Sequence, residues 1–147
     1  MQYQDPDDLA KQCAEHMWAN DAMSQKMGMQ IIAVSQGNAT LSMRISKDML
    51  NGHQTCHGGQ LFSLADSAFA FACNSQNQAA VAANCMIDFI RPAFADDVLT
   101  ATASVVNQGK RSGLYDIKIL NQNNDLIVIF RGNSARINRP VLPISQS

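Results

Sequence analysis

A single carboxylate lies in the middle of an apolar segment of this sequence. Between Gly58 and Cys73 there is no lysine or arginine and one acid, Asp66, among leucine, phenylalanine and alanine residues. The segment has the length and composition of a helix that is buried on most of its surface. A buried carboxylate without a cationic partner is costly, so Asp66 is either a catalytic group or a hydrogen-bonded core residue.

The start of the same segment offers groups that complement a carboxylate. His57-Gly58-Gly59 opens the expected helix, where the first backbone amides have no partner within the helix and carry partial positive charge. Glycine lets a ligand come close to these amides, which can polarise a carbonyl group and stabilise an oxyanion. Asp66 would then act on that carbonyl as a general base or as a nucleophile.

Gly58 and Asp66 cannot both touch one reacting carbon from a single helix. They are eight positions apart, which puts them roughly 12 Å apart along the axis at a rise of about 1.5 Å per residue. Two antiparallel copies of the helix, related by a two-fold axis, would bring Gly58 of one subunit to Asp66 of the partner subunit. We therefore expect a homodimer with two shared sites.

The elements that position these residues follow from periodicity. Residues 6–20 have the apolar spacing of a short amphipathic helix. Strands are predicted over 29–36, 39–46, 79–90, 97–108, 112–122 and 126–138. Gly37-Asn38 is predicted as the tight turn between the first two. The tail, 139–147, has two prolines and is expected to be loose.

This order of elements predicts one α+β domain over residues 1–147. A single helix cannot bury its whole circumference against one face of a flat sheet. We therefore expect an antiparallel sheet that curls around the long helix, with a second copy of the chain covering the remaining surface.

Composition excludes several classes of function. The net charge of −1 argues against general nucleic-acid binding, and no apolar run reaches the length of a membrane span. The N-terminus is acidic and polar where a signal peptide would be basic and then apolar, so the protein is expected in the cytoplasm. Cys13, Cys56, Cys73 and Cys85 lack the spacing of metal ligands, and we expect free thiols and no metal.

Four segments together resemble one family. They are NGHQTCHGGQLFSLADSAFAFACNSQ, IDFIRPAFADDVLTATA, QGKRSGLYDIKI and FRGNS. They resemble the PaaI-type phenylacetate-degradation thioesterases of the hotdog fold, over residues 5–137. The resemblance implies an antiparallel sheet wrapped around one long central helix, in dimers that commonly pair into homotetramers. It also implies hydrolysis of acyl-coenzyme A thioesters, of phenylacetyl or hydroxyphenylacetyl type, without a cofactor.

The resemblance assigns roles to matching residues. The Gly58 amide would polarise the thioester carbonyl, and Asp66 of the partner subunit would be the carboxylate. Asn51 and His57 would order the loop at the thioester end. Relatives often carry a small hydroxyl residue near the start of the strand after the helix, where it positions water. The sequence has Ala83-Asn84 there, and Asn84 is our candidate.

The second half of the chain is basic, which suits the phosphates of coenzyme A. Residues 91–147 hold seven Lys or Arg and four Asp. Residues 1–90 hold four Lys or Arg and eight Asp or Glu. By resemblance, the expected phosphate contacts are Arg91, Gly109, Lys110, Arg111, Ser112 and Gly113. Met86, Phe69 and Phe71 are candidates for an apolar acyl pocket, with core packing as the alternative role of each.

Other chemistries remain as alternatives. Cys56-His57 contains a thiol and a base, but adjacent residues rarely meet in the geometry that a nucleophile needs. A hydratase or dehydratase of acyl thioesters is a second possibility, and a non-catalytic acyl-CoA-binding protein is a third. Release of free coenzyme A would distinguish a thioesterase from both.

Overall fold

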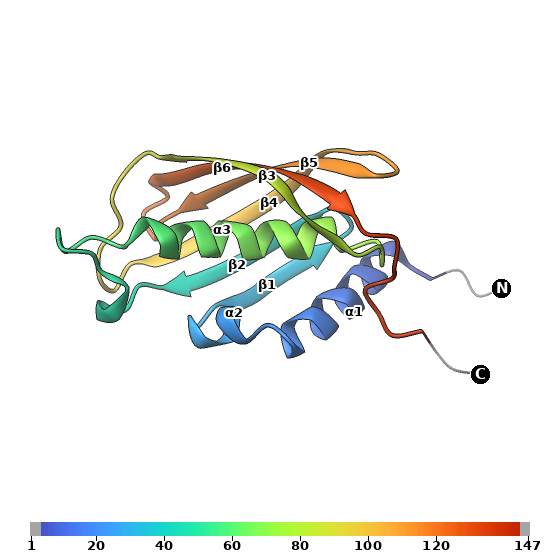
Figure 1. Ribbon diagram of the computed structural model, residues 1–147. Coiled ribbons are helices and arrows are strands. Elements are labelled where there is room, and N and C mark those ends of the chain that lie inside the picture. Colours follow the sequence, from blue (N-terminus) through green and yellow to red (C-terminus); the bar gives the residue numbers. More distant parts are fainter. Residues whose placement is uncertain (1–3, 145–147) are drawn as a thin grey trace.

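The computed structural model describes residues 4–144 of the chain (Figure 1). The helices are α1 (Pro6–Ala19), α2 (Ala22–Lys26) and α3 (Gly58–Cys73), with a short 3-10 helix, η1 (Lys47–Met49). The strands are β1 (Gln30–Ser35), β2 (Asn38–Arg44), β3 (Ala80–Phe89), β4 (Val98–Gln108), β5 (Ser112–Leu120) and β6 (Leu126–Arg136). The predicted α+β class is confirmed, and the predicted strands agree with the observed ones to within two residues at each end.

The described strands form one antiparallel sheet that curls around α3 (Figure 1). Their order is β1-β2-β4-β5-β6-β3, and each neighbouring pair runs antiparallel. Strands β1 and β3 are the two edges. Helix α3 lies across the concave face, and α1 packs beside β1. The central helix is therefore covered by the sheet on one side and flanked by the β3 edge on another.

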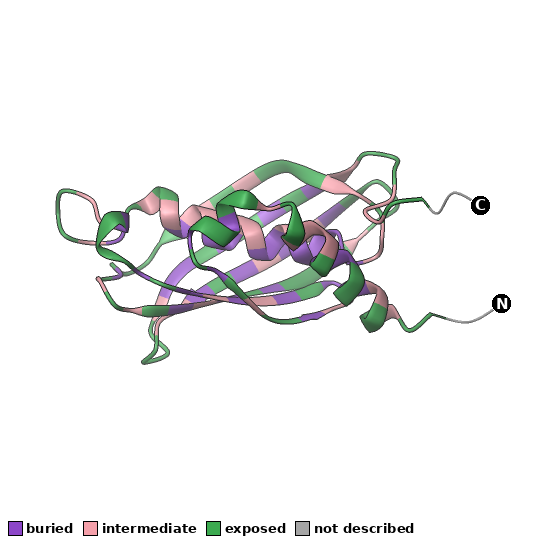
Figure 2. Cartoon of the chain, turned by 90° about the horizontal axis from the view of Figure 1, so that it is seen from below, coloured by how far each residue is buried: buried purple, intermediate pink, exposed green. Residues whose placement is uncertain are grey.

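Aromatic packing fixes α3 on the sheet. The ring of Phe69 lies 5.6 Å from Tyr115 and 6.1 Å from Phe130, measured between ring centroids. Gly132 of β6 lies under the same ring, since a Cβ there would be 2.8 Å from it. Figure 2 shows the buried residues gathered where the sheet faces α3. The side of β6 that carries Phe130 and Gly132 is therefore the inner face of the sheet.

Three local features differ from the sequence-based expectations. Helix α2, with Asp21 as its N-cap, and the helix η1 lie in segments where only connections were expected. The first hairpin turns at Gln36-Gly37, one residue before the predicted pair, because Ser35 pairs with Asn38 and Gly37 takes a φ of 77°. The left-handed φ explains why glycine stands at this position.

The start of the tail, which was predicted to be loose over 139–147, makes hydrogen bonds to the rest of the chain, and residues 145–147 lie outside the described residues. The side-chain Oδ1 of Asn77 accepts hydrogen bonds from the backbone N–H of Val141 and of Leu142. The carbonyl of Arg139 accepts another from the N–H of Ala79, at 2.8 Å. Residues 139–142 are therefore fixed against the end of α3. No helix within residues 4–144 combines the length and apolar character that crossing a membrane requires.

Candidate active site

The loop before α3 is organised by one asparagine side chain. The Asn51 Oδ1 accepts hydrogen bonds from the backbone N–H of His53, at 2.9 Å, and of Thr55, at 3.2 Å. The Asn51 N–H also donates to the Thr55 carbonyl, at 2.8 Å. Further along, the N–H of His57 donates to the carbonyl of Met49. The loop is therefore closed on itself and delivers the chain to α3 in a fixed direction.

The first amide of α3 is available to a ligand. His57 caps the helix by accepting a hydrogen bond at Nδ1 from the N–H of Gly59, at 2.9 Å. The N–H of Gly58 has no hydrogen-bond partner within residues 4–144. It borders a small pocket of about 280 Å³ lined by Asn51, Phe89 and Arg91, among others. A carbonyl oxygen that enters this pocket could accept a hydrogen bond from the helix terminus.

Asp66 opens into a different and larger cleft. It is half-buried in the middle of α3 and lines a cleft of about 680 Å³ together with Asp21, Phe69 and Ala82. Burial raises the pKa of Asp66 above its ordinary value, and the charge of Asp21 raises it further. Gly58 does not line this cleft, and Asp66 does not line the pocket of Gly58. Within one chain, the two groups are therefore apart, as the helical rise predicts.

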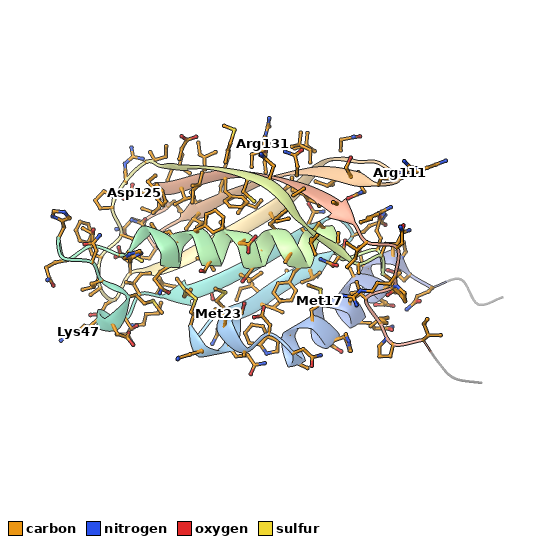
Figure 3. All side chains as sticks on the ribbon, in the orientation of Figure 1. Met17, Met23, Lys47, Arg111, Asp125 and Arg131 are labelled. Carbon is orange, nitrogen blue, oxygen red and sulfur yellow. The ribbon has the colours of Figure 1, made fainter. Side chains whose placement is uncertain are left out.

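Two predicted substrate contacts lie on the outer face of the sheet, away from Asp66. Asn84 pairs with Asn133, and Met86 pairs with Arg131, which points away from α3 (Figure 3). A register shift between Ala82 and Asn84 causes this placement, since it reverses the alternation of side chains along β3. Asn84 and Met86 therefore face away from α3 of their own chain, and their contact with substrate stays a prediction.

The predicted phosphate contacts fall into two groups. Arg91 lies in the Gly58 pocket, and its Nη1 donates to the Leu126 carbonyl at 3.0 Å. The turn with Lys110 and Arg111 lies at the other end of the molecule, as the positions of Arg111 and Lys47 show (Figure 3). In this turn, the N–H of Gly109 donates to the carbonyl of Ser112.

The turn borders a basic pocket. Lys110 and Arg111 line a space of about 300 Å³ with Arg136 and Arg139, and no acid is among its lining residues. The next residue after the turn, Gly113, is closely packed, since a Cβ there would be 2.8 Å from the ring of Tyr115. The structure thus brings four cations together at the end where the tail is anchored, two of which the sequence analysis did not single out.

Cys56 is poorly suited to nucleophilic attack. Burial raises the pKa of its thiol to about 11, so the thiol stays protonated near neutral pH. Its Sγ donates to the carbonyl of His57, at 3.6 Å. Among residues 4–144, no three His, Cys, Asp or Glu side chains are grouped in a way that could hold a metal ion.

Comparisons with known proteins identify the family of this chain. The sequence profile of the thioesterase superfamily matches residues 53–128, which include the Gly58 amide and Asp66. The chain is 57% identical to the acyl-coenzyme A thioesterase PaaI of Escherichia coli K12 over 128 residues, covering 87% of this chain and 91% of that one. The chain belongs to the thioesterase superfamily.

Two further matches cover most of this thioesterase. A putative esterase of Archaeoglobus fulgidus is 33% identical and covers 93% of this chain and 89% of its own. The solved structure of the E. coli PaaI protein from the phenylacetic acid degradation operon superposes with a TM-score of 0.90, at 54% identity, over 91% of this chain and 97% of that one. The predicted hotdog fold is confirmed.

Several residues of this thioesterase line the Asp66 cleft and were not predicted from the sequence. His16 and Asn20 come from the end of α1, and Asp21 caps α2. Ala82 of β3 also lines the cleft. The only sequence signal for this side of the cleft is the Asp21-x-x-Ser24 pattern of a helix N-cap.

Proposed function

We propose that this thioesterase hydrolyses acyl-coenzyme A, of phenylacetyl or hydroxyphenylacetyl type, to the free acid and coenzyme A. The observation that carries the proposal is the unpartnered N–H of Gly58 at the start of a helix whose one acid is Asp66. The identity to the E. coli acyl-CoA thioesterase supports the substrate class. Four free cysteines suit the reducing cytoplasm, where we place the reaction.

In the proposed reaction, the thioester carbonyl oxygen accepts a hydrogen bond from the N–H of Gly58. Asp66 of the partner subunit takes a proton from water, and the oxygen of that water bonds to the carbonyl carbon. The negative charge on the carbonyl oxygen is stabilised by the helix terminus. When the carbonyl re-forms, the carbon–sulfur bond breaks, and the sulfur of coenzyme A takes the proton from Asp66.

Direct attack by the Asp66 carboxylate is the alternative route. The carboxylate oxygen would bond to the carbonyl carbon, coenzyme A would leave, and water would hydrolyse the resulting anhydride. Single-turnover hydrolysis in oxygen-18 water, followed by mass spectrometry of the Asp66 peptide, distinguishes the routes. Label in the peptide would exclude a purely general-base mechanism.

The proposal requires a homodimer, and the edge of the sheet offers a place for it. Strand β3 has ten residues and is unpaired on one side within the described chain. Val81 and Phe89 on it are about half exposed, at 50% and 54%. Pairing of two β3 edges around a two-fold axis would extend the sheet and bring the two α3 helices side by side. Dimers then pair into a homotetramer in our proposal.

In the proposed complex, basic residues bind coenzyme A. Its phosphates lie against Lys110 and Arg111, with the backbone of Gly109, Ser112 and Gly113 around them, while Arg91 of the partner subunit lies near the thioester end. The four cations of the basic pocket support this assignment, because no lining acid opposes them. The reaction needs no cofactor, since water is the second substrate.

A thiol-release assay tests the proposal. Phenylacetyl-CoA, a hydroxyphenylacetyl-CoA, acetyl-CoA and octanoyl-CoA are each incubated with the protein, and free coenzyme A is measured with a thiol reagent. We expect the arylacetyl thioesters to release coenzyme A fastest. Release from none of the four would contradict the proposal. A change in the acyl group without thiol release would identify a hydratase or dehydratase.

A further inference from the structure

A second carboxylate is fixed in the Asp66 cleft by hydrogen bonds. Asp21 caps α2, and its Oδ1 accepts a hydrogen bond from the N–H of Ser24 at 3.0 Å. The hydroxyl of Ser24 lies 2.6 Å from the other carboxylate oxygen of Asp21 and 2.8 Å from the hydroxyl of Ser67 on α3. Ser67 directly follows Asp66, so the chain of hydrogen bonds that starts at Asp21 ends at the residue next to Asp66.

The direction of these hydrogen bonds follows from their chemistry. An ionised carboxylate only accepts, so the single O–H of Ser24 donates to Asp21. The hydroxyl of Ser67 must then donate to Ser24. Ser24 is almost fully buried, with 1% of its surface exposed. The buried hydroxyl of Ser24, itself oriented by Ser67, therefore holds the Asp21 carboxylate in place.

No other titratable group around Asp66 forms an ion pair with Asp21 within residues 4–144. Arg139, the cation that lines the cleft, has no ion pair within residues 4–144. His16 of α1 lines the cleft as well. Cys73 of α3 also faces it, and its pKa of about 12 keeps it neutral. Cys85 of β3 lies within reach of the Asp66 charge, and burial raises its pKa.

Two more titratable side chains come from the strands that pack against α3. Tyr115 of β5 has its pKa raised to about 12 by burial and donates to Gln108 at 2.6 Å. The charge of Arg136 of β6 lowers the pKa values of Cys73 and Tyr115, and its side chain donates to Gln76. Strands β1, β2 and β4 bury apolar side chains, such as Leu41 and Leu99. Among the described residues, Asp21 is thus the one other acid that lines the cleft of Asp66.

We propose that Asp21 is a positioning residue for the reaction, whose fixed negative charge makes Asp66 a stronger base. This inference rests on the proposed function of Asp66. A negative charge nearby favours the protonated form of a carboxyl group, and a more basic carboxylate takes a proton from water more readily. The pKa of Asp66, raised by burial and then by Asp21, agrees with this role.

The pH dependence of kcat/KM tests the inference. Asp21→Asn removes the charge and keeps an oxygen that can accept from the N–H of Ser24, so α2 remains capped. Because Asp66 must be ionised, the acid limb of the profile should move to lower pH when the charge of Asp21 is removed. Above that limb, turnover should fall about twofold to threefold with the lower basicity. Asp21→Glu, which restores the charge, should move the limb back towards the wild type.

A matched control separates this effect from loss of charge in general. Asp5 is the N-cap of α1 and accepts from two backbone N–H groups, but it does not line the Asp66 cleft. Asp5→Asn therefore makes the same chemical change at the same type of position. We expect it to leave the acid limb unchanged. An equal shift in both variants would overturn the inference.

Direct titration of Asp66 makes the result independent of activity. The side-chain carboxyl carbon of Asp66 is followed by NMR over pH, with its signal assigned by comparison with Asp66→Asn. We expect a lower Asp66 pKa in folded Asp21→Asn than in the wild type. An unchanged pKa would overturn the role of Asp21 even if the wild type releases coenzyme A. If no thioester is hydrolysed, the proposed function fails, while this titration still decides the effect of Asp21 on Asp66.

Discussion

Asp66 is a partly buried carboxylate without a side-chain partner among the described residues. No side-chain hydrogen bond or ion pair to it is present within residues 4–144, and its pKa is raised by burial. A core aspartate retained for stability would be expected to accept hydrogen bonds from neighbouring groups. The Asp66 carboxylate is therefore not held by another side chain of the described residues, which is compatible with the proposed catalytic role.

Replacement of Asp66 should separate activity from stability. We expect Asp66→Ala or Asp66→Asn to lower turnover by about 100-fold or more, the scale of a lost general base. Thermal stability should be kept or raised, because a partly buried charge is removed. Thiol release and a thermal melt of each variant measure the two effects. Near-wild-type turnover in a folded Asp66→Ala protein would refute the catalytic assignment.

The raised pKa of Asp66 also predicts how stability depends on pH. A carboxyl group whose pKa is higher in the folded chain than in the unfolded chain stabilises the fold below its unfolded pKa of about 3.9. That contribution is lost as pH rises through the folded pKa. The free energy of unfolding of Asp66→Asn, minus that of the wild type, should therefore be larger at about pH 7.5 than at about pH 4. Urea unfolding at both pH values measures it, and a difference that shrinks with rising pH would contradict the prediction.

At the scale of single elements, the loop before α3 depends on Asn51. Asn51→Ala removes the acceptor for the N–H groups of His53 and Thr55 and loosens the segment that leads to Gly58. We expect kcat/KM to fall about tenfold or more, because a small displacement of the amide weakens its contact with the carbonyl. Thr55→Val is a partial control, since it keeps the backbone bonds and removes one hydroxyl contact. An equal loss in both variants would argue against a specific role for Asn51.

The contact of α3 with β6 sets a limit on side-chain size at Gly132. Gly132→Ala would place a Cβ 2.8 Å from the ring of Phe69, so the helix or the strand must shift. We expect a loss of about 1–3 kcal/mol in the free energy of unfolding. Gly52→Ala is the control, because no heavy atom lies within 4 Å of its Cβ position. Equal unfolding curves for the two variants would contradict the close packing.

Sequence patterns predicted the elements with strong periodicity and missed the weak ones. The alternation in β5 and the apolar run in α3 predicted both elements closely. Helix α2 was missed because its five residues are too short to show a period, and only its cap Asp21 marks it. The family resemblance suggested Asn84 for the site, and the sequence does not show the bulge that turns its side chain to the outer face of the sheet. Without the shift after Ala82, Asn84 would lie on the inner face.

At the scale of the whole molecule, the proposed site requires two chains, and mixed dimers test this. Asp66→Ala disables one half of each site, and Gly58→Pro removes the amide of the other half. Proline suits the first position of a helix, and the N–H that it lacks has no partner within residues 4–144. A mixed dimer then has one site with both lesions and one site with neither.

Refolding an equal mixture of the two variants should restore activity. Random pairing gives about half heterodimers, each with one intact site, so roughly a quarter of the wild-type activity should return. Gly58→Ala is the control for bulk, because it keeps the N–H and adds the Cβ that meets the ring of Phe89 at 3.2 Å. It should retain more activity than Gly58→Pro. No recovery in a mixture that native mass spectrometry shows to contain heterodimers would refute the shared site.

The anchored tail determines where a tag or a fused domain at a terminus would lie. Asn77 and Ala79 fix residues 139–142 at the end of α3 where α1 also begins, so both ends of the described chain leave the molecule on one side (Figure 1). The loop with Asn51 lies on the opposite side. A purification tag, a fused domain or a solid support joined at either terminus would therefore be attached at the end of the chain that carries the Asp66 cleft, away from the Asn51 loop of the same chain. Shortening the chain into 139–142 would instead remove part of the wall of the Asp66 cleft.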